Sequence, residues 1–238
     1  MRRYIYFVFL LCCAVNLLLT SCVRQKYVVM DMVHHNPGEA MTESKFLDPS
    51  FLKKNEYGAK VFFLFEAAQF GIDWKSFDPS LFPDTTEAGR WVAEKAEIIH
   101  KKYDAAKKED LQVYCMLDML VLPSLLVEKH RTELTNEQGK LDISKPYTQL
   151  CIRELMKEMF ETFPQLDGLV IRTGETYLHD APYYVGNHPV QNGMYDHITL
   201  INLLREEVCE RRNKKLFYRT WDMGQLHSIP KYYLSVTD

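Results

Sequence analysis

Charged side chains stand at the ends of several short apolar runs in this sequence. The clearest case is Asp167–Tyr177 (DGLVIRTGETY), where three β-forming residues lead into Arg172 and, three residues later, Glu175. This run has no helical period, so it predicts a fully buried parallel strand. The carboxyl ends of strands in a (β/α) barrel carry the catalytic groups, because the loops there converge on one cleft. Glu175 is therefore the first candidate for acid–base chemistry.

The other apolar runs end in the same way. If the predicted strands lie side by side, their polar ends line one rim together with Arg172 and Tyr177. Carboxylates accept hydrogen bonds from hydroxyl groups, aromatic rings stack on sugar C–H surfaces, and arginine binds a carboxylate through two hydrogen bonds. The set suits a polar ring such as a sugar. The groups that complete it are Glu66 after Lys60–Phe65, Asp118 after Leu111–Leu117, Arg219, Trp221 and Asp222 at Leu216–Thr220, and His34, His35 and Asn36 after Tyr27–Val33.

Each of these groups also has a purely structural interpretation. Glu175 is as well placed to pair with Arg172 or Arg219, or to be solvated, as to donate a proton. Glu66 and Asp118 can instead neutralise the charge of a neighbouring side chain inside a barrel. Arg172 is then the ion-pair partner of such a buried carboxylate. The polar aromatic tract from Thr176 to Gly193 is long for a passive connector, and long loops of this kind are typically functional or disordered.

The elements that position these groups alternate between strand and helix. Helices are predicted from Asp48 to Lys54, from Thr85 or Thr86 onwards, from Pro146 to Thr162 (with Leu150, Leu155, Met159 and Phe160 inward), and from Asp196 as N-cap. Long polar loops are predicted through Pro123 and Asn136–Gly139. This alternation predicts an α/β fold with parallel strands. A doubly wound sheet and a barrel share the pattern, but no glycine-rich phosphate loop follows the first strand, which favours the barrel.

The predicted fold is an incomplete (β/α) TIM-type barrel. About five β/α units are present where a closed barrel has eight. The sequence also stops shortly after the fifth predicted strand. We therefore expect the amino-terminal part of a barrel enzyme, or a truncated reading frame.

The amino terminus predicts export. Arg2 and Arg3 precede the apolar stretch Tyr4–Leu19, and Leu19-Thr20-Ser21-Cys22 resembles the lipobox of bacterial lipoproteins. This resemblance implies a signal peptide at 1–21, a lipidated Cys22 that anchors the chain in the membrane, and a barrel domain at 22–238. The expected location is the bacterial cell envelope, at the outer membrane or facing the periplasm. The alternative is an uncleaved transmembrane anchor, for which the apolar run is short.

Composition excludes several classes of function. The chain has 238 residues, 47% of them hydrophobic, and a net charge of −3 without clusters of lysine and arginine, so no nucleic-acid partner is expected. Cys115, Cys151 and Cys209 are widely separated and odd in number, which predicts buried thiols in place of a disulfide framework or zinc site. The histidines lack metal-ligand spacing, and Walker, serine-elbow and CxxC motifs are missing from the sequence, so neither a metal nor a cofactor is predicted.

Two stretches resemble a known family. GLVIRTGETY and KLFYRTWD are similar to barrel strands of the bacterial α-glucuronidases of glycoside hydrolase family 67. The resemblance implies hydrolysis of uronic-acid-containing or related glycans, with Glu175 as general acid, Arg172 at the rim, and the catalytic base on strands beyond Asp238. Thr176–Pro182 departs from the glycine- and proline-rich sequence of the family, which leaves the substrate open. We expect no counterpart of the family's amino-terminal β-sandwich domain, because the first predicted strand begins soon after Cys22.

Two alternatives to an enzyme stay open at this stage. A surface lipoprotein that binds an oligosaccharide or polysaccharide without cleaving it would use the same aromatic loops. An inactive truncated product would expose a sheet edge and half of a barrel core.

Overall fold

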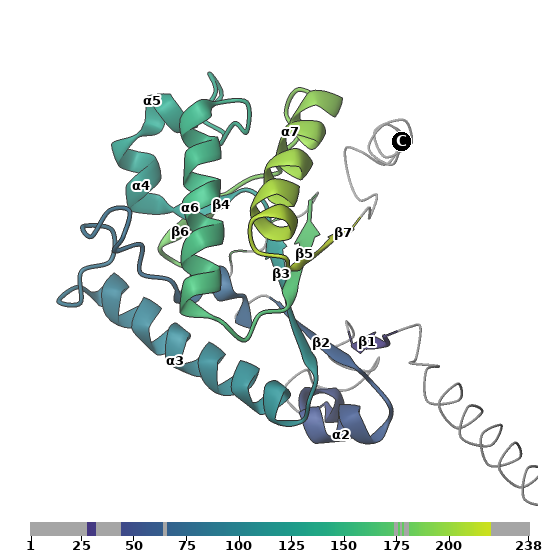
Figure 1. Ribbon diagram of the computed structural model, residues 1–238. Coiled ribbons are helices and arrows are strands. Elements are labelled where there is room, and N and C mark those ends of the chain that lie inside the picture. Colours follow the sequence, from purple (N-terminus) through teal and green to yellow (C-terminus); the bar gives the residue numbers. More distant parts are fainter. Residues whose placement is uncertain are drawn as a thin grey trace, which may run out of the picture.

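A curled half-barrel of five parallel strands forms the framework of the protein (Figure 1). The computed structural model describes residues 28–31, 44–63, 66–173, 176, 178 and 181–219. Within these ranges the strands follow one another in the sheet in chain order, whereas a doubly wound sheet reverses its order at the centre. The predicted α/β fold with parallel strands is confirmed, and closure into a TIM-type barrel stays a prediction. In order, the strands are β1 (Met30–Asp31), β2 (Ala59–Phe62), β3 (Gln112–Asp118), β5 (Gly168–Arg172) and β7 (Lys215–Arg219).

Helices cover the convex face of this sheet. Helices α6 and α7 lie next to each other, α3 runs obliquely below them, and α2 lies near β1 and β2 (Figure 1). Shorter elements fill the connections, including a second, two-stranded antiparallel sheet formed by β4 and β6. The helical elements are η2 (Lys45–Leu47), α2 (Pro49–Lys54), η4 (Ala68–Gly71), α3 (Glu87–Lys108), α4 (Ser124–Lys129), α5 (Arg131–Leu134), α6 (Pro146–Thr162), α7 (Met194–Leu204) and the π-helical η5 (Arg205–Glu210), and the small sheet comprises β4 (Val121–Pro123) and β6 (Tyr184–Gly186).

Local capping signals explain where two of the helices begin. Thr86 accepts a hydrogen bond from the Gly89 N–H and caps α3, and Asp48 accepts one from the Ser50 N–H and caps α2. Helix α6 has the predicted bounds. The prediction that Asp196 is the N-cap of α7 is wrong, because the helix begins two residues earlier. The Asp196 carboxylate instead accepts hydrogen bonds from N–H groups of the preceding loop.

Two apolar clusters lie on opposite faces of the sheet, because alternate strand residues point to opposite sides. The larger cluster packs between sheet and helices and includes Cys115 and Cys151, as predicted for buried thiols; Cys209 is half-buried. The smaller cluster, on the concave face, consists of Ala59, Val61, Tyr114, Met116 and Val170. One predicted inward residue of α6 is wrong: Leu150 is 41% exposed. The helix turns the neighbouring Cys151 and Ile152 inward in its place.

The two long loops predicted from the sequence are more ordered than expected. The loop through Pro123 contains β4, α4 and α5, and the tract between Thr176 and Gly193 contains β6. Tyr184 of β6 is buried against Phe70 and Phe82, so this tyrosine fills the core. Asn187 likewise serves the fold, because its side chain bonds to both backbone groups of Leu141.

The predicted signal peptide and Cys22 lie outside the described residues. Among the residues that are described, no helix combines the length and the apolar character that crossing a membrane requires. Lipidation at Cys22 therefore stays a prediction.

Candidate functional site at the carboxyl ends of the strands

The carboxyl ends of β3, β5 and β7 bring three predicted residues to one level of the sheet. Asp118 is the register partner of Arg172, and Arg172 is the register partner of Arg219. Register partners in a parallel sheet point to the same face. All three follow the alternation that places Met116, Val170 and Phe217 on the concave side. These three residues therefore lie at one level on the concave side of the sheet, and their role in binding stays a prediction.

Asp118 and Arg172 form a buried ion pair with bidentate geometry. Arg172 Nε donates to Asp118 Oδ1 at 2.5 Å and Nη2 donates to Oδ2 at 2.6 Å, and each side chain is only 8% exposed. Charge-assisted, paired hydrogen bonds of this kind fix both planes relative to each other. Two of the donor nitrogens of Arg172 are thus directed at a carboxylate of the protein, as the structural interpretation of these residues anticipates.

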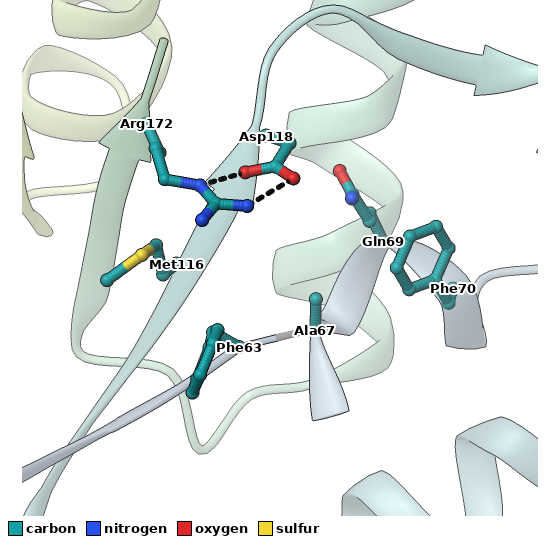
Figure 2. A pocket seen from close by; sticks show the side chains of 7 residues that line it. All are labelled: Phe63, Ala67, Gln69, Phe70, Met116, Asp118 and Arg172. Atoms are coloured by element: carbon teal, nitrogen blue, oxygen red, sulfur yellow. Dashed lines mark hydrogen bonds and ion pairs between the residues drawn. The ribbon is translucent and has the colours of Figure 1, made fainter. Parts of the chain in front are cut away.

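A small hollow opens beside this ion pair (Figure 2). Gln69 of η4 contributes its amide end next to the Asp118 carboxylate, and apolar side chains form most of the remaining wall. The space that the centre of a water-sized group can occupy there is about 10 Å³, close to the smallest volume that holds one water molecule. The lining consists of Phe63, Ala67, Gln69, Phe70, Met116, Asp118 and Arg172.

Gln69 is held in place by the backbone of η4. The Ala68 N–H donates to Cys115 Sγ at 3.2 Å, and the Tyr184 hydroxyl donates to the Gln69 backbone carbonyl at 3.3 Å. The side chain of Gln69 is 2% exposed, and within the described part of the chain no donor reaches its Oε1 atom. Among the described residues, the Gln69 amide oxygen is therefore a buried acceptor without a donor.

Glu66 is bonded to a helix on the convex face of the sheet. Its carboxylate forms an ion pair with Lys102 of α3, and its backbone carbonyl accepts a hydrogen bond of 2.9 Å from the Tyr103 hydroxyl. Glu66 is not among the residues that line the hollow. The structure thus groups Asp118, Arg172 and Arg219 and places the Glu66 carboxylate with α3.

The remaining predicted site residues, Glu175, Tyr177, Trp221 and Asp222, lie outside the described residues, as do His34 and His35. The positions that flank Glu175 are partly described. Thr173 follows β5 and is 2% exposed, and the Thr176 side chain approaches Gly186 of β6. The chain thus leaves β5 at the rim and next packs against the small sheet.

Sequence reasoning missed Gln69 together with the apolar walls Phe63, Phe70 and Met116. Gln69 falls four residues beyond the predicted second strand, in a stretch with no known motif. The one signal that could have found it is its place just past a strand end, the same criterion that selected Glu66.

The Cys115 thiol is buried next to this region. Burial raises its pKa to about 12, so the thiolate that would act as a nucleophile is not formed near neutral pH. Across the described ranges, no group of three or more histidine, cysteine, aspartate or glutamate side chains is arranged to hold a metal ion.

No family model matches the chain, and no curated protein is similar to it. Two solved structures resemble it over most of its length. One is a noncanonic maltogenic alpha-amylase, AmyB, from Thermotoga neapolitana, with 14% identity and a TM-score of 0.45 over 87% of this chain and 46% of that one. The other is a GH138 enzyme targeting pectin rhamnogalacturonan II, with 13% identity and a TM-score of 0.42 over 88% of this chain and 24% of that one. The chain spans less than half the length of either structure, and similarity at this level assigns no family.

Proposed function

We propose that the chain is a glycan-acting protein of the glycoside hydrolase type, with the carboxyl ends of β3, β5 and β7 as its binding surface and Glu175 as general acid. The proposed substrates are oligosaccharides or polysaccharides that contain uronic acid or related sugars. The observation that carries the proposal is the hollow beside the Asp118–Arg172 pair, where charged and apolar side chains meet at the carboxyl ends of parallel strands.

The chemistry of such a site fits a sugar. In this proposal the hydroxyl groups of a sugar donate to carboxylates at the strand ends, and the C–H face of its ring packs on aromatic side chains of the neighbouring loops. Glu175 follows the end of β5 by three residues. Hydrolysis of a glycosidic bond requires a protonated carboxyl group that donates to the leaving oxygen. A general acid of this kind contributes about 10²- to 10⁴-fold to the rate.

The test compares two leaving groups in the variant Glu175→Gln. We expect hydrolysis of glycosides with poor, unactivated leaving groups to fall by at least about 100-fold, while aryl glycosides with good leaving groups retain most of their rate. Initial rates on matched alkyl and nitrophenyl glycosides measure the difference. Equal losses on both substrates would refute the assignment of Glu175 as proton donor.

A matched control removes a carboxylate elsewhere. The side chain of Glu133 in α5 is 53% exposed and contacts His130 and Thr132. Glu133 is not one of the predicted rim residues. Glu133→Gln should leave both rates unchanged, which shows that losing one negative charge is not sufficient for the effect.

A second candidate function is glycan binding without catalysis. The observation that favours it is that both described carboxylates among the predicted rim residues, Glu66 and Asp118, are engaged in ion pairs. Calorimetry with oligosaccharides, followed by chromatography of the same samples, separates the two functions. Binding without any cleaved product would replace the hydrolase by a binding protein at the same surface.

A further inference from the structure

We propose that a surface pocket beside α4 holds a neutral sugar unit and forms a second carbohydrate site, separate from the strand ends. Three segments that are distant in the sequence form its wall: residues 80–88 at the start of α3, the first turns of α4, and Pro182–Tyr183. None of the described residues in this wall also lines the hollow beside Asp118. The inference rests on the proposed function for the class of ligand and adds a second place at which the glycan is held.

The first step of the argument is the size and accessibility of the pocket. Its volume is about 340 Å³, within the range of about 300–1,000 Å³ that is usual for small-ligand sites. Leu125 in its wall is 38% exposed, and Glu128 and Pro182 are exposed as well. A ligand therefore reaches these side chains directly from solvent, and the pocket has room for a whole sugar ring.

The second step is the apolar part of the wall, which is held in place before any ligand binds. The Tyr183 ring packs edge to face against Trp91, with 5.8 Å between the centroids, and its hydroxyl is hydrogen-bonded to the Glu87 side chain. Phe82 is 2% exposed and stacks on the buried Tyr184. Aromatic surface fixed in this way can cover the C–H face of a sugar ring with little loss of side-chain freedom on binding.

The third step is the polar part of the wall. Ser124 and Glu128 are four residues apart in α4, so their side chains lie on the same side of the helix, one turn apart. Among the described residues, neither side chain has a hydrogen-bond or ion-pair partner, and the adjacent Lys129 is paired with Asp78. A serine hydroxyl that donates and accepts, next to a carboxylate that accepts, matches neighbouring hydroxyl groups of a sugar.

The fourth step is the charge of the wall. Glu128 is the one charged side chain among the described residues that line the pocket. A uronic acid bound here would place its carboxylate near that of Glu128 without a cation between them. Repulsion between like charges therefore selects a neutral sugar unit, even where the glycan carries a uronic acid elsewhere.

The experiment locates sugar binding with variants of exposed side chains. The full chain is titrated by calorimetry with maltotetraose, cellotetraose, xylotetraose and tetragalacturonate. We expect at least one of the three neutral sugars to bind. Leu125→Arg places a long cationic side chain three residues before Glu128 on the same helix and fills the pocket. It should raise the Kd of the best neutral tetrasaccharide at least about tenfold.

The matched control for this variant is Leu150→Arg. Leu150 of α6 is 41% exposed and does not line the pocket. Its Kd should equal that of the wild type, and both arginine variants should keep the wild-type urea midpoint.

A second variant removes an acceptor without filling the pocket. Glu128→Ala should raise the Kd of the same sugar about tenfold, because a hydrogen bond to a charged group is lost. The change lies on the surface and leaves no described partner unpaired. Glu133→Ala removes an exposed carboxylate of α5 that does not line the pocket, and it should bind the sugar as the wild type does.

A cation is the competing occupant, because an ammonium group would also pair with Glu128 beside an aromatic ring. Tetramethylammonium chloride is the probe for this alternative. If it binds with a Kd that Leu125→Arg raises, while the Kd of every neutral sugar is unchanged in that variant, the pocket belongs to a cation and the inference is overturned.

Other results would overturn the inference while leaving the proposed function intact. They are a wild-type Kd in either Leu125→Arg or Glu128→Ala, an equal loss of affinity in Leu150→Arg, and binding of tetragalacturonate alone. Failure of the wild type to bind any of the four glycans would overturn the proposed function as well.

Discussion

Breaking the Asp118–Arg172 pair is the most direct test of how the rim is built. Both side chains are 8% exposed and joined by two short hydrogen bonds, so removing either one leaves a buried charge without its bidentate partner. Such a loss typically costs about 3–5 kcal/mol. Against a total stability of about 5–15 kcal/mol for a single domain, this is a large fraction. We therefore expect Arg172→Met and Asp118→Leu each to lower the stability by about 3–5 kcal/mol.

The double variant distinguishes a coupled pair from two independent contributions. Replacing a whole buried ion pair by apolar residues is often neutral or stabilising. The combined variant Asp118→Leu/Arg172→Met should therefore be more stable than either single variant. The expected coupling free energy in the double-mutant cycle is about 3 kcal/mol or more.

Urea unfolding at neutral pH measures these differences. Trp74 is fully buried, and its fluorescence reports loss of the core. With a urea dependence of about 2 kcal/mol per molar, the single variants should shift the midpoint down by about 2 M. The exposed pair Lys53–Asp110 provides the control, and Lys53→Met should change the stability by less than about 1 kcal/mol. Additive losses in the double variant would refute the reasoning.

Two further predictions concern the anchor and the pH dependence of folding. Cys22→Ala should abolish incorporation of an alkyne-labelled fatty acid and move the chain out of the membrane fraction; labelling that persists in the variant would contradict lipidation at Cys22. Burial, and after it the neighbouring His188, lowers the pKa of His197 to about 4. The unfolded chain binds this proton near pH 6.5, so the contribution of His197 to stability is complete above pH 6.5 and declines as the pH falls towards 4. His197→Gln retains a hydrogen-bonding partner for the Tyr218 hydroxyl and should reduce the loss of unfolding free energy between pH 6.5 and 4 by about 1–3 kcal/mol, as measured by urea titrations at several pH values. An unchanged slope would mean that another group titrates in this range.

Sequence predicted the elements whose signals are local. The caps Asp48 and Thr86, the proline at the start of α6 and the apolar run of β5 each lie within a few residues of the structure they determine. The small sheet could not be predicted in this way. Its strands are short and pair across about sixty residues of chain, and the apolar pattern of three residues is too brief to distinguish strand from loop.

The candidate site was predicted in part for the same reason. Strand ends located Asp118, Arg172 and Arg219, and parallel register placed them at one level. The choice between a substrate contact and an internal ion pair depends on side-chain geometry, which a linear pattern does not contain. The place of Gln69 depends on the fold even more strongly, because this residue lines the hollow only when η4 packs against β3.

The antiparallel pairing of β4 with β6 connects the segment that follows β3 with the segment that follows β5. Hydrogen bonds between Leu120 and Asn187 continue this connection towards the rim. An insertion or deletion in one of these segments would therefore shift the register in which β4 pairs with β6. Changes in the length of these two segments should therefore occur together, and transfer of one of them alone into another scaffold should fail.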